Sequence, residues 1–105
     1  MRVLAVSGRV DQAHAKPLED ALAPYLTQCT AGGEALVLDF SGVDYISSVG
    51  LRVLLLAARQ AKAQNGRIAI AALSPMVAEV FKVSRFDLVL SAHASVDAAV
   101  AALAP

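Results

Sequence analysis

The chain has 105 residues, of which 57% are hydrophobic and 17% charged. This length fits one domain with a hydrophobic core, and it is too short for two. Nine basic and nine acidic residues cancel, and no basic stripe is present, so nucleic-acid binding is not expected. One cysteine and two histidines make no metal-ligand set and no internal disulfide, so we expect no metal, no cofactor and a reducing compartment.

The first half of the chain alternates strand and helix patterns. The β-branched run Arg2–Val10 predicts a strand. Apolar residues three and four apart predict an amphipathic helix over Ala15–Thr27, which Pro24 should kink or loosen at its end. The apolar run Ala35–Leu38 is typical of a strand that is covered on both faces.

The second half continues this alternation. It predicts helices over Ser48–Gln64, Ser74–Val83 and Ser95–Leu103, and strands over Arg67–Leu73 and Phe86–Leu90. The whole chain, 1–105, should therefore form one α/β domain with a central mixed sheet and about four helices. In the helix over Ser48–Gln64 we expect one face to be buried, made by Leu51, Leu54, Leu55 and Ala58. The opposite face should be exposed and should carry Arg52, Arg59 and Lys62. Met76, Val80 and Phe81 should belong mostly to the core, with exposed neighbours that extend a binding face.

The stretch DYISSVGLRVLL, from Asp44 to Leu55, places two serines at the entrance of a predicted helix. A serine there can accept a hydrogen bond from a free N–H group of the first turn, which stabilises a helix by about 1 kcal/mol. The same N–H groups and the helix dipole also favour a phosphate, and a phosphoserine carries about −1.5 to −2 charges near neutral pH. Gly50 adds little volume, so we expect a partner's backbone to approach closely there.

The chain resembles the STAS family, the bacterial anti-sigma factor antagonists. The resemblance covers nearly its whole length: SGRVD at Ser7–Asp11, LVLDFSGVDYISSVGLRVLL at Leu36–Leu55, NGRIAIAALSPMVAEVFKVSRFD at Asn65–Asp87, and a terminal helix. The middle segment is the most specific. The resemblance implies a STAS fold and a non-enzymatic, cytoplasmic regulator of transcription.

In that family, the serine at this helix entrance is phosphorylated by a serine kinase that is itself the anti-sigma factor. The unphosphorylated antagonist binds the kinase and frees the sigma factor. The phosphorylated form dissociates from the kinase, and a metal-dependent serine phosphatase removes the phosphate. For this chain, the resemblance implies that Ser48 is the phosphoacceptor, with Ser47 as the second choice. It also implies that Asp11 and Asp39 occupy acidic positions near the serine. We expect a partner-binding surface made by Asp11, Asp39, Asp44, Tyr45, Ser47 and Gly50.

The chain departs from the family pattern in two places. Many members have an aspartate followed by two hydroxyl residues directly before Gly-Leu. When this chain is aligned on Gly50-Leu51, Ser47 occupies the position of that aspartate and Val49 the position of the second hydroxyl residue. Most members also have a further strand before the segment that corresponds to Ser7–Asp11. Without that strand, unpaired backbone groups would be open to a homodimer contact or to a partner.

Two other functions remain open. Some stand-alone STAS domains are accessory subunits of lipid-transport ABC complexes, in which the serine end docks on the ATPase; neighbouring genes would separate this function from the first. A small flavodoxin-like hydrolase would need a base beside its serine, and neither His14 nor His93 fits such a pattern. No apolar run reaches transmembrane length and no signal peptide is apparent, so we expect a cytoplasmic protein without membrane insertion.

Overall fold

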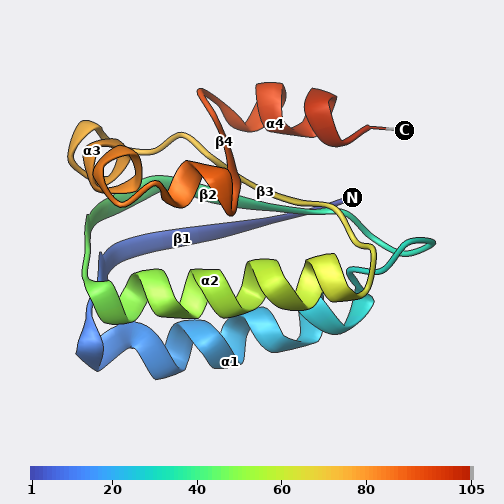
Figure 1. The fold of residues 1–105 in the computed structure, drawn as a ribbon, viewed down its shortest axis with the longest axis horizontal. Helices are drawn as coiled ribbons and strands as arrows, with labels where there is room; N and C mark the ends of the chain where they lie inside the picture. The colour runs from blue at the N-terminus through green and yellow to red at the C-terminus, as the bar shows by residue number, and fades with distance from the viewer. Residues whose placement is uncertain (105) are drawn as a thin grey trace.

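The computed structural model describes residues 1–104, in which one β-sheet has helices on both faces (Figure 1). In chain order the elements are β1 (Arg2–Val10), α1 (Gln12–Gln28), β2 (Leu36–Ile46), α2 (Ser48–Ala63), β3 (Ile68–Ala71), α3 (Pro75–Val83), the short 3-10 helix η1 (Phe86–Leu88), β4 (Ser91–His93) and α4 (Val96–Leu103).

The strands lie in the order β1-β2-β3-β4, and each neighbouring pair is parallel. The α/β fold is thus confirmed, while the expectation of a mixed sheet is wrong for residues 1–104. The reason is the connectivity. A helix follows each of the first three strands and returns the chain to the end of the sheet where that strand began, so the next strand runs in the same direction.

The predicted strand over Phe86–Leu90 is also wrong. The segment forms η1, and β4 begins after it. Phe86 and Leu90 are both buried, whereas Leu88 and Val89 between them are exposed. Buried residues four apart fit a helical turn and not the two-residue period of a strand. In α1, the helix continues past Pro24 to Gln28, so the proline does not end it.

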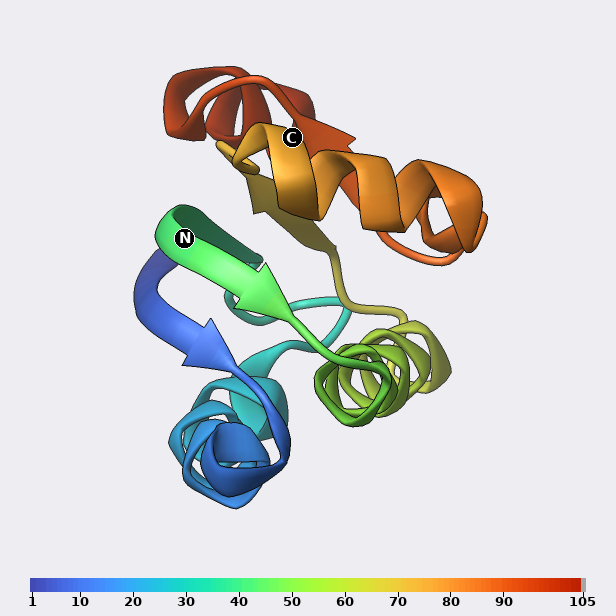
Figure 2. The same cartoon turned by 90° about the vertical axis from the view of Figure 1, so that its left-hand side faces the viewer.

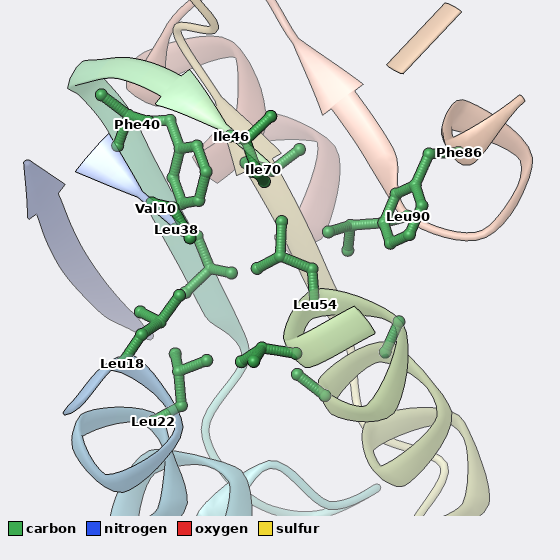
Figure 3. Close-up of a cluster of buried hydrophobic side chains, with 14 of the residues drawn as sticks. Val10, Leu18, Leu22, Leu38, Phe40, Ile46, Leu54, Ile70, Phe86 and Leu90 are labelled. Carbon is green, nitrogen blue, oxygen red and sulfur yellow. The ribbon is translucent and has the colours of Figure 1, made fainter. Parts of the chain in front are cut away.

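Both faces of the sheet are covered. On one face, side chains from β2 and β3 meet α1 and α2 in the main core, which includes Leu38, Ile70, Leu22 and Leu54 (Figure 3). On the other face, α4 packs on the sheet, and its Ala99 is buried together with residues of β2 and β3 (Figure 1). The central strands are therefore apolar on both sides, as predicted.

The expected faces of α2 are confirmed. Leu54 and Ala58 are buried, Leu51 and Leu55 are half-buried against the main core, and the basic residues Arg52, Arg59 and Lys62 are exposed. The end of α2 is tied to α1, because the Gln64 side-chain amide donates to the carbonyl oxygens of Leu26 at 2.8 Å and Cys29 at 2.7 Å. These contacts fix the direction of α2, and so the position of its first turn.

Helix α3 contributes less to the core than expected. Phe81 is buried and Val80 is half-buried, but Met76 is 59% exposed and Val83 is 75% exposed. The assignment of Met76 to the core is therefore wrong, and α3 presents apolar side chains to solvent. No helix within residues 1–104 combines the length and apolar character that crossing a membrane requires.

Candidate functional site

The first turn of α2 lies against the end of β1. Ile46, the last residue of β2, pairs with Val10, the last residue of β1. The Ser47 N–H then donates to the Val10 carbonyl oxygen at 2.9 Å. Figure 2 looks onto this side of the molecule, where β1 runs into α1 and β2 runs into α2. The pairing of β1 with β2 thus brings the entrances of the two helices together.

Ser47 is the N-cap of α2. Its hydroxyl oxygen accepts a hydrogen bond from the Gly50 N–H at 3.2 Å, and its O–H donates to the Val10 carbonyl oxygen at 3.3 Å. The side chain is half-buried. The capping role that we considered for either serine therefore falls to Ser47, whose hydroxyl is used both as donor and as acceptor.

Ser48 has a different environment. It is the first residue of α2 and is exposed, and within residues 1–104 its hydroxyl forms no hydrogen bond. Val49 beside it is 39% exposed. The Ser48 hydroxyl therefore faces solvent at the positive end of the helix dipole, where the first N–H groups of a helix favour an anion.

Gly50 is buried, so it does not offer its backbone to a partner as we had expected. A Cβ atom added to Gly50 would lie 2.6 Å from the Val10 carbonyl oxygen and 2.7 Å from Val10 Cγ1. These contacts are too close for any side chain. The glycine lets the first turn of α2 pack directly on the end of β1.

Asp11 joins the start of α1 to a small charged cluster. Its carboxylate caps α1 by accepting from the His14 N–H at 3.2 Å, contacts His14 Nδ1 at 2.7 Å and lies 3.4 Å from Arg9 Nε. The side-chain hydrogen bond with His14 holds the pKa of Asp11 below its usual value. The guanidinium carbon of Arg9 lies 4.3 Å from the centre of the Tyr45 ring. The cluster Arg9–Asp11–His14–Tyr45 thus borders the end of β1 on which Ser47 rests.

Arg9 and His14 were missed as members of this site. His14 is exposed, and its spacing of three from Asp11 at a helix start was a usable signal for their contact. Arg9 could be found only from the register, because it lies opposite Tyr45 in the β1–β2 pair. That register depends on a contact between segments far apart in the sequence.

Asp39 does not lie at the same level of the sheet as Ser47 and Ser48. It pairs with Ala5 of β1 and Ala71 of β3, and its Oδ1 accepts from the Ser41 N–H at 3.0 Å. Five residues of β1 separate Ala5 from Val10, or about 16 Å in an extended strand. The register therefore corrects the expectation that Asp39 is near the serines. Asp44 is exposed and lies two residues before the end of β2.

The site offers hydroxyl and charge chemistry without a metal centre. In the described part of the chain, no three histidine, cysteine or acidic side chains are grouped closely enough to hold a metal ion. Cys29 is buried and far along α1 from this end, its thiol donates to the Arg67 carbonyl oxygen at 3.3 Å, and burial raises the pKa of the thiol. Ser48 offers the site an exposed hydroxyl that no hydrogen bond within residues 1–104 engages.

Comparisons with known proteins agree with this fold. The family model described as Mlab, STAS domain, matches residues 2–92. BtrV of Bordetella bronchiseptica, which carries the name of an anti-sigma factor antagonist, is 40% identical over 102 residues, or 97% of this chain and 85% of BtrV.

Solved structures are similar over the same length. An anti-sigma factor antagonist from Mycobacterium paratuberculosis is 26% identical, with a TM-score of 0.85 over 96% of this chain and 83% of that chain. The unphosphorylated form of the anti-sigma factor antagonist SpoIIAA is 21% identical, with a TM-score of 0.73 over 93% of this chain and 83% of that chain, and shows a common fold. The chain therefore belongs to the STAS-domain family, as its sequence motifs predicted.

Proposed function

We propose that this protein is an anti-sigma factor antagonist that works by partner switching. In its unphosphorylated form it binds an anti-sigma factor that is a serine kinase; phosphorylation of Ser48 releases it, and a serine phosphatase restores it. The names of BtrV and of the Mycobacterium paratuberculosis structure support the antagonist role. A structure of SpoIIAA is of the phosphorylated form, which supports a switch of this kind.

The observation that carries the choice of Ser48 is the contrast between the two adjacent hydroxyls. Transfer of a phosphoryl group to Ser47 would replace the proton that its hydroxyl donates to the Val10 carbonyl oxygen, and it would add a bulky group to the half-buried cap of α2, where the Gly50 N–H donates its hydrogen bond. Ser48 is exposed and free of such bonds within the described residues. A phosphate on Ser48 would also lie at the first turn of a helix, where negative charge is stabilising, so the phosphorylated chain should stay folded.

Release follows from the charge that phosphorylation adds. We propose that the partner covers the Ser48 end of α2 together with Asp11, Asp44 and Tyr45 nearby. A phosphoserine carries about −1.5 to −2 charges, and these would have to lose water inside a close interface. Binding to the kinase should then weaken while the fold is unchanged.

The first test is phosphorylation with the candidate kinase and ATP, followed by site mapping by mass spectrometry. We expect one phosphate on the wild-type protein. The Ser48→Ala variant should carry none, and the Ser47→Ala variant should still be modified if it folds, which circular dichroism checks. Phosphate mapped on Ser47 alone would show that the wrong residue was chosen.

The second test measures binding to the same kinase by calorimetry. Ser48→Ala should bind about as tightly as the wild type, whereas Ser48→Asp should bind at least about tenfold more weakly, which corresponds to about 1.4 kcal/mol. Ser95→Asp is the matched control, because Ser95 caps α4 and the same charge is placed at the start of another helix. Equal weakening by both aspartates would mean that net charge matters and that this position does not.

A second candidate function is that of an accessory STAS subunit in a lipid-transport ABC complex. The exposed side chain of Val49 favours it, because an apolar group beside Ser48 suits a permanent docking surface and accepts no phosphate. In that case no kinase would modify the protein, and binding to the ATPase would be lost in Val49→Asp. The two candidates therefore differ in the response to ATP and kinase.

A further inference from the structure

Strand β1 has a free edge. It pairs with β2 on one side and is the first strand in the sheet order, so nothing within residues 1–104 pairs with its other side. In Figure 2 the blue strand lies at the margin of the sheet. A long strand edge exposes backbone N–H and C=O groups, which bind other strands unless charges, prolines or a covering element prevent it.

The outward groups can be assigned from the hydrogen bonds of the inner side. The Arg2 N–H donates to the Ala35 carbonyl oxygen at 2.8 Å, at the start of β2. Alternate residues of a strand turn their backbone groups to opposite sides. The N–H and C=O groups of Val3, Ala5 and Ser7 therefore face away from the sheet. The positive φ of Gly8, 83°, interrupts the regular strand after them.

The β1–β2 register shifts between Ala5 and Ser7 and again between Gly8 and Arg9, but this edge lacks two of the usual protections, charge and proline. The segment from Val3 to Ser7 contains no charged residue and no proline, and the side chain of Val3 is 49% exposed. A groove of about 250 Å³ runs beside the edge, lined among others by Leu4 and Val6 of β1 and by Pro17 and Ala21 of α1. The edge thus combines unpaired backbone groups with an apolar groove, which fits an extended strand with apolar side chains.

We propose that the occupant is a second copy of this chain, with its own β1 antiparallel to the first and a two-fold axis at Ala5. In this register Ala5 faces Ala5 of the second copy, and Val3 faces Ser7 of the second copy. All three outward-facing residues then pair with one another, which gives about six backbone hydrogen bonds between the copies. A continuous sheet results. The proposal rests on the fold alone and does not depend on the proposed switch at Ser48.

Side-chain fit favours a second copy over an unrelated strand. The same register sets Leu4 opposite Val6 of the second copy, on the side of the groove, and Arg2 opposite Gly8. Arg9 lies opposite Met1 of the second copy, whose ammonium is paired with Glu34. On α1, Ala13, Pro17 and Ala21 are exposed at positions four apart, and such small side chains let two helices approach closely.

The size of the contact is also adequate. A strand of nine residues is about 30 Å long, and the sheet edge with its helix layer is about 20 Å deep, so each copy would bury about 600 Å². The total of about 1,200 Å² lies at the lower limit of stable, specific interfaces. We therefore expect a dimer that dissociates on dilution.

The test is the oligomeric state of the full chain, measured by sedimentation equilibrium between about 1 µM and 1 mM. The wild type should pass from monomer to dimer. Ala5→Pro removes an outward N–H, which proline tolerates at a strand edge, and it should raise the dissociation constant at least about 100-fold while the circular dichroism spectrum stays that of the wild type. The matched control is Met76→Lys with Val83→Lys, which removes exposed apolar surface on α3 and should leave the dimer intact.

Amide hydrogen exchange gives a second measurement on the wild type alone. The amides of Val3, Ala5 and Ser7 should become protected as concentration rises, and those of Leu4 and Val6 should not change. The proposal would be overturned if the protein stayed monomeric over the whole concentration range, or if only the α3 lysine variant lost the dimer. It would also be overturned if the exchange rates of the edge amides did not depend on protein concentration. Protection that appears only with a different protein would show that the edge serves that partner.

Discussion

Ser47 and Ser48 carry the same side chain, but they contribute differently to the fold. Ser47 bonds both to the first turn of α2 and to Val10, whereas the hydroxyl of Ser48 is open to solvent. Ser47→Ala should lower the free energy of unfolding by about 0.5–2 kcal/mol through loss of the cap. Ser48→Ala should change it by less than about 0.5 kcal/mol. Urea unfolding of both variants measures the difference, and equal losses would contradict the assignment of the cap.

Gly50 is a second residue whose role depends on its neighbours. A Cβ atom at this position would lie 2.6 Å from the Val10 carbonyl oxygen, so Gly50→Ala must push α2 away from β1. The variant should lose about 1–3 kcal/mol, the usual cost of overpacking. Gly32→Ala is the control, because an added Cβ there meets nothing within 4 Å. Thermal unfolding should separate the two, and a Gly50→Ala midpoint as high as that of Gly32→Ala would refute the close packing.

At the scale of the element, α2 connects the core to the site. Leu54 in its middle is fully buried and points toward Ile70 of the sheet (Figure 3), whereas Leu56 is 47% exposed. Leu54→Ala should cost about 2–5 kcal/mol because it leaves a cavity. Leu56→Ala removes the same atoms from a more solvent-exposed position and should cost less than about 1 kcal/mol. Chemical denaturation tests this pair, and similar losses would mean that the expected buried face is wrong.

The elements that the sequence predicted well are those with a strong local pattern. The bounds of α2 and α3 follow from capping serines and three- and four-residue spacings, and the β-branched residues predicted β1 in its observed place. The segment from Phe86 to Leu90 misled us because its apolar composition outweighed its four-residue spacing. The direction of the strands is not a local property, and that is why the mixed sheet was wrong.

The candidate site was predicted in part for the same reason. The serines and Asp11 are recognisable because capping and helix entry leave local signals. The level of Asp39 in the sheet and the contact of Arg9 with Tyr45 depend on the β1–β2 register. Which serine bonds to Val10 also depends on that non-local pairing. Residue types were therefore readable from the sequence, whereas their mutual positions were not.

At the scale of the whole molecule, ion pairs lie at both ends of β1. At its start the N-terminal ammonium of Met1 bonds to Glu34, and this hydrogen bond holds the pKa of Glu34 below its usual value. Beyond its end, the bond with His14 lowers the pKa of Asp11 in the same sense. A carboxyl with a lowered pKa in the folded state stabilises the fold above its usual pKa, and this contribution is lost as the pH falls through the folded pKa.

Acid should therefore weaken the Met1–Glu34 pair at the start of β1 and the contact between Asp11 and His14 at the start of α1. We expect the urea midpoint to fall as the pH drops below the usual range of carboxyl pKa values, and to fall less steeply in an Asp11→Asn, Glu34→Gln variant. Asparagine is also a good N-cap, so this variant keeps α1 capped at neutral pH. Glu79→Gln is the matched control, since in the described residues Glu79 forms no ion pair, and it should keep the wild-type slope. Because both pairs are open to water, the effect should shrink in high salt. If the urea midpoint fell equally steeply at low pH in the wild type, the double variant and the control, other groups would govern the stability of the domain at low pH.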